Sequence, residues 1–234
     1  MGALLLGLAG VVPCTIVRRV NRFVVEILVS GRGARAYINN TGRLSEYLVE
    51  GRKGFCLRSS GTKTKYRLFA VEDMGSAALV DTRLQMSAFE KAVELSLLPW
   101  LEGCAVRRRD YRLGESVIDY MLSCPRGDFL VEVKSAVLRQ GDYAMYPDCP
   151  TQRGRRHIAA LTSYVRSGGR AAIVFIAALP YVRAFKPYAE GDPEILSLLR
   201  EAASSGVLIK ALAMHFDPAL SAIVLDDPDL TVEL

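Results

Sequence analysis

Histidine and cysteine are scarce in this chain of 234 residues, which has two histidines and five cysteines. The cysteines are Cys14, Cys56, Cys104, Cys124 and Cys149, an odd number without any C-x-x-C pair. Disulfide frameworks and Cys/His zinc sites draw on paired, closely spaced residues, so this pattern argues against both. We therefore expect free thiols, which suit a cytoplasmic protein.

A long hydrophobic run is also missing. Residues 1–17 are apolar, but no Lys or Arg precedes them and Pro13 interrupts them. A bilayer-spanning helix needs about 20 residues, and a secretory signal begins with positive charge. We interpret this stretch as a buried strand pair, with a cleaved signal as the alternative, and expect no membrane partner.

The charge of the chain is divided unevenly along its length. Hydrophobic residues make up 50% and charged residues 24%, the balance of an ordinary globular protein, which excludes wholesale disorder. Residues 1–78 hold 12 Lys/Arg against 5 Asp/Glu, residues 79–189 hold 16 against 11, and residues 190–234 hold 2 against 9. The two basic blocks favour a polyanion partner, although a solvated basic surface has the same composition.

Two kinds of pattern divide the chain into domains 1–78 and 79–234. Short apolar runs at 15–20, 23–29, 34–38, 54–58 and 66–72, separated by turn residues, predict a small antiparallel barrel or sandwich. Met74, Gly75 and Ser76 form a plausible link, after which residues 86–98 have helical spacing. Strands at 116–122, 129–138, 171–178 and 207–213 alternate with helices at 150–167 and 192–205. A hairpin followed by βαβαβ predicts an α/β domain with a mixed sheet.

Charged residues interrupt the apolar strand 129–138. Glu132 and Lys134 are two residues apart and share one face. If the preceding hairpin centres on Pro125 and Arg126, opposed residues have numbers that sum to 251, and Asp119 faces Glu132. Two facing carboxylates suit Mg²⁺ or Mn²⁺, and a lysine beside them suits metal-assisted phosphodiester hydrolysis. The alternative is a solvated Glu–Lys ladder pair.

These residues resemble the metal site of the PD-(D/E)XK nuclease superfamily, and the chain is similar to the sugar fermentation stimulation protein A family in particular. The motifs that carry the similarity are R-R-V-N-R-F (18–23), N-N-T-G-R-L (39–44), K-T-K-Y (63–66), S-V-I-D-Y-M-L (116–122), V-E-V-K-S-A-V-L (131–138), Y-P-D-C-P-T-Q-R-G-R-R-H (146–157) and D-P (192–193). The resemblance implies an N-terminal OB-like barrel, a nuclease-like α/β domain, and DNA or RNA as substrate. Val117 departs from the usual arginine of the family and Tyr146 from its phenylalanine.

The start of helix 150–167 adds candidates for phosphate contact and catalysis. Arg153 and His157 are four residues apart, so they share a helix face near Thr151. A helix N-terminus with an arginine binds phosphate, and His157 is a candidate acid for the leaving oxygen. An exposed basic helix face is the alternative.

Further ligands are needed to complete a metal site. The Val133 carbonyl lies between the two charged side chains of its strand and is a candidate ligand beside Asp119 and Glu132. Glu90, on the helix 86–98, is a candidate additional carboxylate. Asp148 is either a third ligand or the N-terminal cap of the following helix.

In the first domain, basic and aromatic residues mix as in grooves that track phosphates while bases stack. Asn39 to Gly42 has the composition of a turn, and the family resemblance makes it a contact loop. The candidate nucleic-acid-binding residues of the chain are Arg18, Arg22, Asn40, Lys63, Lys65, Arg67 and Arg153.

The sequence therefore predicts a divalent-metal-dependent nuclease acting on DNA or RNA, with a homodimer left open. The competing function is a DNA-binding regulator whose nuclease-like domain cleaves little or nothing. A structural protein with incidental basicity is a third alternative. Two apposed carboxylates repel phosphate, which favours the enzyme over the binder.

Overall fold

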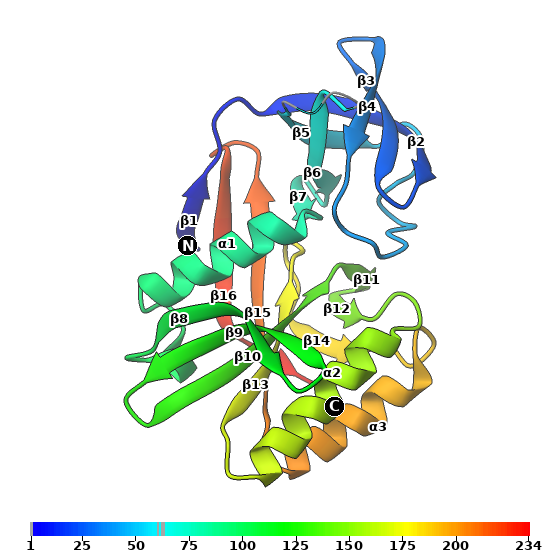
Figure 1. The fold of residues 1–234 in the computed structure, drawn as a ribbon. Helices are drawn as coiled ribbons and strands as arrows, with labels where there is room; N and C mark the ends of the chain where they lie inside the picture. The colour runs from blue at the N-terminus through cyan, green and yellow to red at the C-terminus, as the bar shows by residue number, and fades with distance from the viewer. Residues whose placement is uncertain (1, 60, 62–63) are drawn as a thin grey trace.

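The computed structural model describes residues 2–59, 61 and 64–234. Its first part is a closed five-stranded barrel at the top of Figure 1, built from β2 (Val12–Asn21), β3 (Val24–Val29), β4 (Arg32–Tyr37), β5 (Lys53–Arg58) and β6 (Tyr66–Asp73). Each strand pairs with two others, in the closed order β2, β3, β4, β6, β5 and back to β2. Register shifts in β2 let this long strand bend from one pairing to the next. Of the predicted barrel or sandwich, the structure has the barrel, although β4 and β6 pair parallel and not antiparallel as expected.

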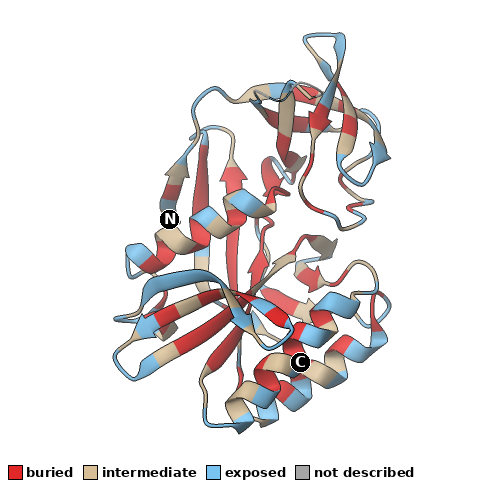
Figure 2. Ribbon diagram, in the orientation of Figure 1, coloured by how far each residue is buried: buried red, intermediate tan, exposed pale blue. Residues whose placement is uncertain are grey.

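The second part is built on a mixed sheet. Its strands are β8 (Ala105–Leu113), β9 (Ser116–Cys124), β10 (Gly127–Ala136), β13 (Ala171–Ala177), β15 (Leu208–Asp217) and β16 (Ala222–Val232). They lie in that order; β10, β13 and β15 are parallel, and the others pair antiparallel. All seven residues of β13 are buried, as expected for a parallel strand covered on both faces (Figure 2). The predicted α/β class with a mixed sheet is confirmed.

Helices cover both faces of this sheet (Figure 1). Helix α1 (Thr82–Glu94) lies on one face, and α2 (Gln152–Arg166) and α3 (Pro193–Ser204) lie together on the other. A 3-10 turn, Pro99–Leu101, follows α1. Short strands β11 (Leu138–Gln140), β12 (Tyr143–Tyr146) and β14 (Ala184–Pro187) extend the sheet beside β16. Among the described residues, no helix has the length and hydropathy to cross a bilayer.

Three local expectations were wrong. Strand β1 (Ala3–Gly7) pairs with β16, so it belongs to the second sheet and does not form a strand pair with its neighbour β2; Met1 lies outside the described residues. The expected link at 74–76 is a tight turn between β6 and β7 (Ser76–Leu79). Helix α1 begins earlier than predicted because Asp81 caps it, accepting from the Leu84 amide at 2.9 Å, and it ends before Ser96, whose φ is 54°.

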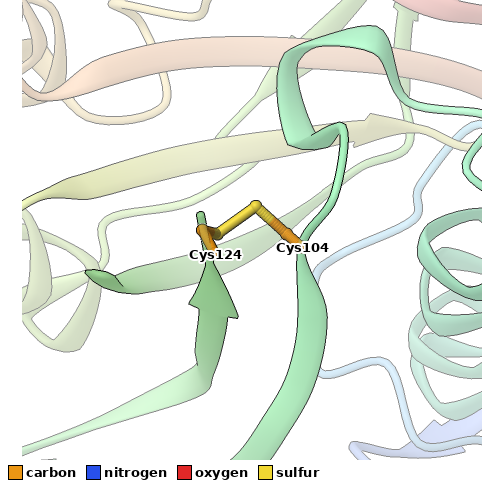
Figure 3. Close-up of a disulfide and its surroundings, with 2 residues drawn as sticks. All are labelled: Cys104 and Cys124. Atoms are coloured by element: carbon orange, nitrogen blue, oxygen red, sulfur yellow. A yellow bond between two sulfur atoms is a disulfide. The ribbon is translucent and has the colours of Figure 1, made fainter. Parts of the chain in front are cut away.

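A disulfide also corrects the expectation of free thiols. Cys104 and Cys124 are bonded, with their Cα atoms 4.1 Å apart (Figure 3). They are 20 residues apart in sequence, and the pairing of β8 with β9, which places Ala105 opposite Ser123, brings them together. Sequence spacing alone does not reveal a long-range hairpin register. Cys14, Cys56 and Cys149 are free thiols.

The barrel and the mixed sheet share one hydrophobic core. Phe216 of β15 packs edge-on against Phe55 and Phe69 of the barrel, with ring centroids 5.2 and 4.8 Å away. Strand β7 pairs with β6 on one side and with β15 on the other, and the Ser76 hydroxyl donates to the Phe216 carbonyl at 3.1 Å. The two parts are therefore packed together through buried side chains as well as through the chain.

This shared core predicts that the two parts unfold together. Phe216→Ala should lower the free energy of unfolding by about 3–5 kcal/mol, because it leaves a cavity where the aromatic rings meet. Urea denaturation of this variant should show a single unfolding transition, with its midpoint at a lower urea concentration than that of wild type. The control is Leu220→Ala, at a side chain that is 60% exposed in the next turn, with an expected change near zero. Two separate transitions in the Phe216 variant would contradict a shared core.

Candidate functional site

The candidate site lies where the hairpin of β9 and β10 opens. The two strands pair from Gly127 with Cys124 to Val131 with Tyr120, so paired residue numbers sum to 251 as predicted. Beyond this point side chains replace the backbone ladder: the Val133 amide donates to Asp119 Oδ2 at 2.8 Å, and the Asp119 amide donates to Glu132 Oε2 at 3.3 Å. The structure therefore brings Asp119 and Glu132 together across the opened ladder.

Glu132 is an ionised carboxylate held below the surface. The residue is 2% exposed, and its Oε1 atom lies 2.5 Å from Lys134 Nζ and 2.5 Å from His157 Nδ1. Burial alone would raise the pKa of Glu132, but Lys134 and His157 outweigh it and hold that pKa below its usual value. Burial would likewise lower the pKa of Lys134, yet the facing Glu132 carboxylate raises it. Lys134 is therefore an ammonium ion at neutral pH.

His157 has a supporting position rather than the predicted catalytic one. It is a buried residue of α2. Arg153 Nε donates to its Nε2 atom at 3.4 Å, so the hydrogen-bond pattern assigns the ring proton to Nδ1, which faces Glu132. Both ring nitrogens are engaged. His157 positions Glu132 and has no free nitrogen for the role of acid toward a leaving oxygen.

Asp119 is the carboxyl of the site whose ionised form is disfavoured. Burial, followed by the nearby Glu132 carboxylate, raises the pKa of Asp119 to about 7, although the Val133 amide acts in the opposite direction. The N–H and C=O of one strand residue point to the same side, so the Val133 carbonyl also faces the opened ladder. Two carboxylates and a carbonyl form an oxygen donor set that fits Mg²⁺, Mn²⁺ or Ca²⁺.

No group of three His, Cys, Asp or Glu residues converges as a metal cage within the described part of the chain. This is consistent with a site that relies on a backbone carbonyl and on water beside its two carboxylates. Mg²⁺ usually retains several waters and is held by one or two carboxylates, so this donor set is sufficient for it.

The carboxylates line a cavity of about 460 Å³ between the barrel and the mixed sheet. The barrel contributes Arg22 and the loop that contains Asn39 to Leu44, which we call the 39–44 loop. The second part contributes the floor, on β10, and a wall at the start of α2. Residues from this part that line the cavity include Asp119, Glu132, Val133, Lys134, Ser135, Tyr146, Asp148, Cys149, Thr151 and Arg153.

The 39–44 loop is fastened to the second part at both ends. Near its start, Asn39 binds Asp81 Oδ1 at 2.9 Å, and Asn40 donates to the Ser135 hydroxyl at 3.4 Å. At its end, the Leu44 amide donates to Asp148 at 3.1 Å. Thus Asn40, a predicted binding residue, lies in the cavity wall.

The N-terminal cap of α2 is Thr151 and not Asp148. The Thr151 hydroxyl accepts from the Gly154 amide at 3.0 Å. Asp148, expected as a cap or a third metal ligand, lines the cavity and accepts a hydrogen bond from the Leu44 amide of the 39–44 loop. A side chain at Gly42 would collide with Asp148, since an added Cβ atom would lie 2.6 Å from Oδ2.

The predicted basic residues fall into two groups. Arg22 and Arg153 line the cavity, whereas Arg18 pairs with Glu26 at 2.7 Å on the outside of the barrel. Arg67 is also paired, with the buried Asp81 at 3.2 Å, which corrects its assignment to a free binding surface. Lys65 is exposed, and Lys63 lies outside the described residues.

Glu90 does not join the carboxylate pair. It accepts a hydrogen bond from Tyr120 at 2.7 Å and pairs with Arg109. Tyr120 and Asp119 are consecutive strand residues, so their side chains point to opposite faces of the sheet. The candidate additional carboxylate is therefore on the α1 side, away from the cavity.

Sequence reasoning missed the role of Arg19. Its guanidinium donates to the carbonyl oxygens of Arg22 at 2.9 Å, Asn40 at 3.1 Å and Arg43 at 2.9 Å, and also to that of Gly42. Arg19 thereby holds the cavity-facing loops of the barrel in shape. Strand alternation was the available signal, because Arg18 and Arg19 must face opposite sides of β2.

Comparison with known proteins identifies relatives over nearly the whole chain. A family model described as "SfsA N-terminal OB domain" matches residues 17–80, and one described as "Sugar fermentation stimulation protein RE domain" matches residues 83–220. A sugar fermentation stimulation protein homolog of Pyrococcus furiosus is 53% identical over 222 residues, covering 95% of this chain and 96% of that protein. One from Archaeoglobus fulgidus is 48% identical over 221 residues, covering 94% and 95%.

A solved structure is similar in fold as well. The SfsA protein of Pyrococcus furiosus, determined in complex with Ca²⁺, is 50% identical with a TM-score of 0.95, and the match covers 99% of each chain. The barrel and mixed sheet described above are therefore the architecture of this relative too.

The raised pKa of Asp119 predicts a pH-dependent gain in stability when its charge is removed. Its carboxyl binds a proton more tightly in the folded chain, with a pKa of about 7, than at the ordinary value of 3.8. Ionisation therefore costs the folded state stability as pH rises from about 4 to about 7. In EDTA, Asp119→Asn should melt at a higher temperature than wild type at pH 8, with a smaller difference at pH 5. A difference that is independent of pH would contradict this electrostatic account.

Proposed function

The chain belongs to the sugar fermentation stimulation protein family, and we propose that it is a divalent-metal-dependent nuclease that hydrolyses phosphodiester bonds of DNA or RNA. The observation that carries the proposal is the opened hairpin, where Asp119 and Glu132 face each other beside the ammonium of Lys134. Two carboxylates with one permanent cation, at the floor of a cavity lined by arginines, suit a phosphodiester and a metal ion together.

The proposed metal ligands are Asp119, Glu132 and the Val133 carbonyl, and the proposed cofactor is Mg²⁺ or Mn²⁺. Oxygen donors of this kind also accept Ca²⁺, the ion found with the Pyrococcus furiosus relative. A divalent ion in this position would lower the pKa of a bound water and offset charge on a phosphoryl oxygen.

The protein's own residues supply position and charge. Lys134 remains protonated beside Glu132, so it acts as an electrostatic group toward the phosphate and not as a base. His157 of α2 fixes the Glu132 carboxylate by a hydrogen bond. Arg153, at the start of α2, lies where a helix N-terminus and a guanidinium together attract an anionic phosphate.

Metal binding should depend on Asp119. Calorimetric titration with Mn²⁺ should show an affinity for Asp119→Asn at least about tenfold below that of wild type, since even an indirect partner of a metal ligand contributes that much. The control is Asp148→Asn, which removes a carboxylate from the same cavity that binds the Leu44 amide. The proposed ligand set is wrong if Asp119→Asn keeps wild-type affinity.

A substitution of Lys134 distinguishes a nuclease from a protein that only binds nucleic acid. Lys134→Ala should still bind nucleic acid and Mn²⁺ but lose about 10²–10³ in cleavage rate, the loss typical of one electrostatic group at a transition state. Lys210→Ala is the matched control, because this lysine pairs with Asp229 outside the cavity. Cleavage of labelled DNA and RNA is followed with Mg²⁺, with Mn²⁺ and with EDTA.

Equal cleavage by the Lys134 variant and wild type would remove this residue from the mechanism. If neither protein cleaves with any metal while both bind nucleic acid, the chain is a DNA-binding regulator. Cleavage that persists in EDTA would also contradict the metal-dependent mechanism.

A further inference from the structure

The candidate site is narrow and walled on two sides. Its cavity of about 460 Å³ lies within the range of about 300–1,000 Å³ typical of pockets that enclose one drug-sized molecule. Glu132 is 2% exposed, so a scissile phosphate must enter the cavity to meet the carboxylates. A cavity of this volume accommodates one nucleotide with its phosphate.

The wall contributed by the barrel is fixed in place. The 39–44 loop is bound to Asp81, Ser135 and Asp148 of the second part. On the barrel side, the partly buried Arg19 of β2 donates to the backbone carbonyls of the same loop. These contacts leave the loop no freedom to retreat from a wide substrate without breaking several hydrogen bonds at once.

An exposed aromatic side chain belongs to the chain neighbour of a residue that lines the cavity. Phe23 follows Arg22, which lines the cavity, and is 46% exposed. The Arg22 guanidinium lies 5.9 Å from the Phe23 ring centroid, and the Phe23 amide is fixed to the Asn21 side chain at 2.9 Å. Exposed aromatic rings next to arginines stack the unpaired bases of single strands, and bases inside a duplex are not available for such contact.

We propose that the site acts on single-stranded nucleic acid, with the scissile phosphate between the carboxylates and Lys134 and a neighbouring base stacked on Phe23. The inference rests on the proposed nuclease function. The scissile phosphate lies on the outside of a strand whether or not it is paired, so the preference for an unpaired strand depends on the stacked base. Here the exposed ring favours a strand that is already unpaired.

The experiment compares one labelled oligonucleotide in two states, free and annealed to its complement, made as DNA and as RNA. Binding is measured by fluorescence anisotropy in EDTA, and cleavage is measured with Mn²⁺. The wild-type protein should bind the free strand at least about tenfold more tightly than the duplex, because stacking of one base on an aromatic ring contributes about that much to the affinity. The DNA and RNA arms identify which sugar the site accepts.

The stacking residue is tested by three variants. Phe23→Ala should weaken single-strand binding by about tenfold, and Phe23→Trp should restore it because the indole also stacks. The control is Tyr181→Ala, and its binding should equal that of wild type. Tyr181 is 66% exposed and, unlike Phe23, it has no neighbour in the chain that lines the cavity.

The outcomes separate the two proposals. If wild type binds or cleaves the duplex as well as the free strand, the single-strand inference is overturned while the nuclease function stands. Wild-type affinity in Phe23→Ala would likewise overturn the stacking contact. If no substrate is cleaved with any metal, the nuclease function fails, and the anisotropy ratio in EDTA still decides the strand preference.

Discussion

A buried negative charge governs the arrangement of the site. Removing an ionised carboxylate from water costs several kcal/mol unless partners compensate it, and Glu132 has three: the Lys134 ammonium, His157 and the Asp119 amide. For Asp119, burial and the Glu132 carboxylate outweigh the Val133 amide, Lys134 and Arg153, so its pKa is raised to about 7. Its carboxyl is therefore the part of the site that requires a proton or a cation, which is the physical basis of the proposed metal centre.

The same constraint shapes the hairpin and its surroundings. The β9–β10 ladder stops at Val131 and Tyr120 because the carboxylates take over the next backbone hydrogen bonds. The barrel forms one wall of the cavity at this opened hairpin. Phe216 joins the two parts through the aromatic core, and the 39–44 loop then spans the cavity wall. The first domain thus contributes to the geometry of the site as well as to its charge.

Net charge gave only part of the electrostatic picture. Arg18 and Arg67 count toward the basic balance of the first domain, but each faces a carboxylate, Glu26 and Asp81 respectively. The Arg19 guanidinium donates its hydrogen bonds to backbone carbonyls. Among the described residues, the basic side chains that line the cavity are Arg22, Lys134 and Arg153, which is fewer than the composition of the chain suggests.

Local rules acting on the sequence predicted the barrel strands, the mixed sheet through β9, β10, β13 and β15, and the facing of Asp119 and Glu132, because side-chain alternation and a short turn fix a hairpin register over a few residues. They missed strands β8 and β16, which lie on either side of those four. They did not determine contacts between distant segments. The Cys104–Cys124 disulfide, the pairing of β1 with β16, and the position of Glu90 on the opposite face all follow from how strands and helices pack. His157 shows the difference most clearly. Its helix and spacing were readable from the sequence, but its burial beneath Glu132 depends on how α2 packs on the sheet, and this packing changes its role from a group that meets substrate to one that holds a carboxylate in place.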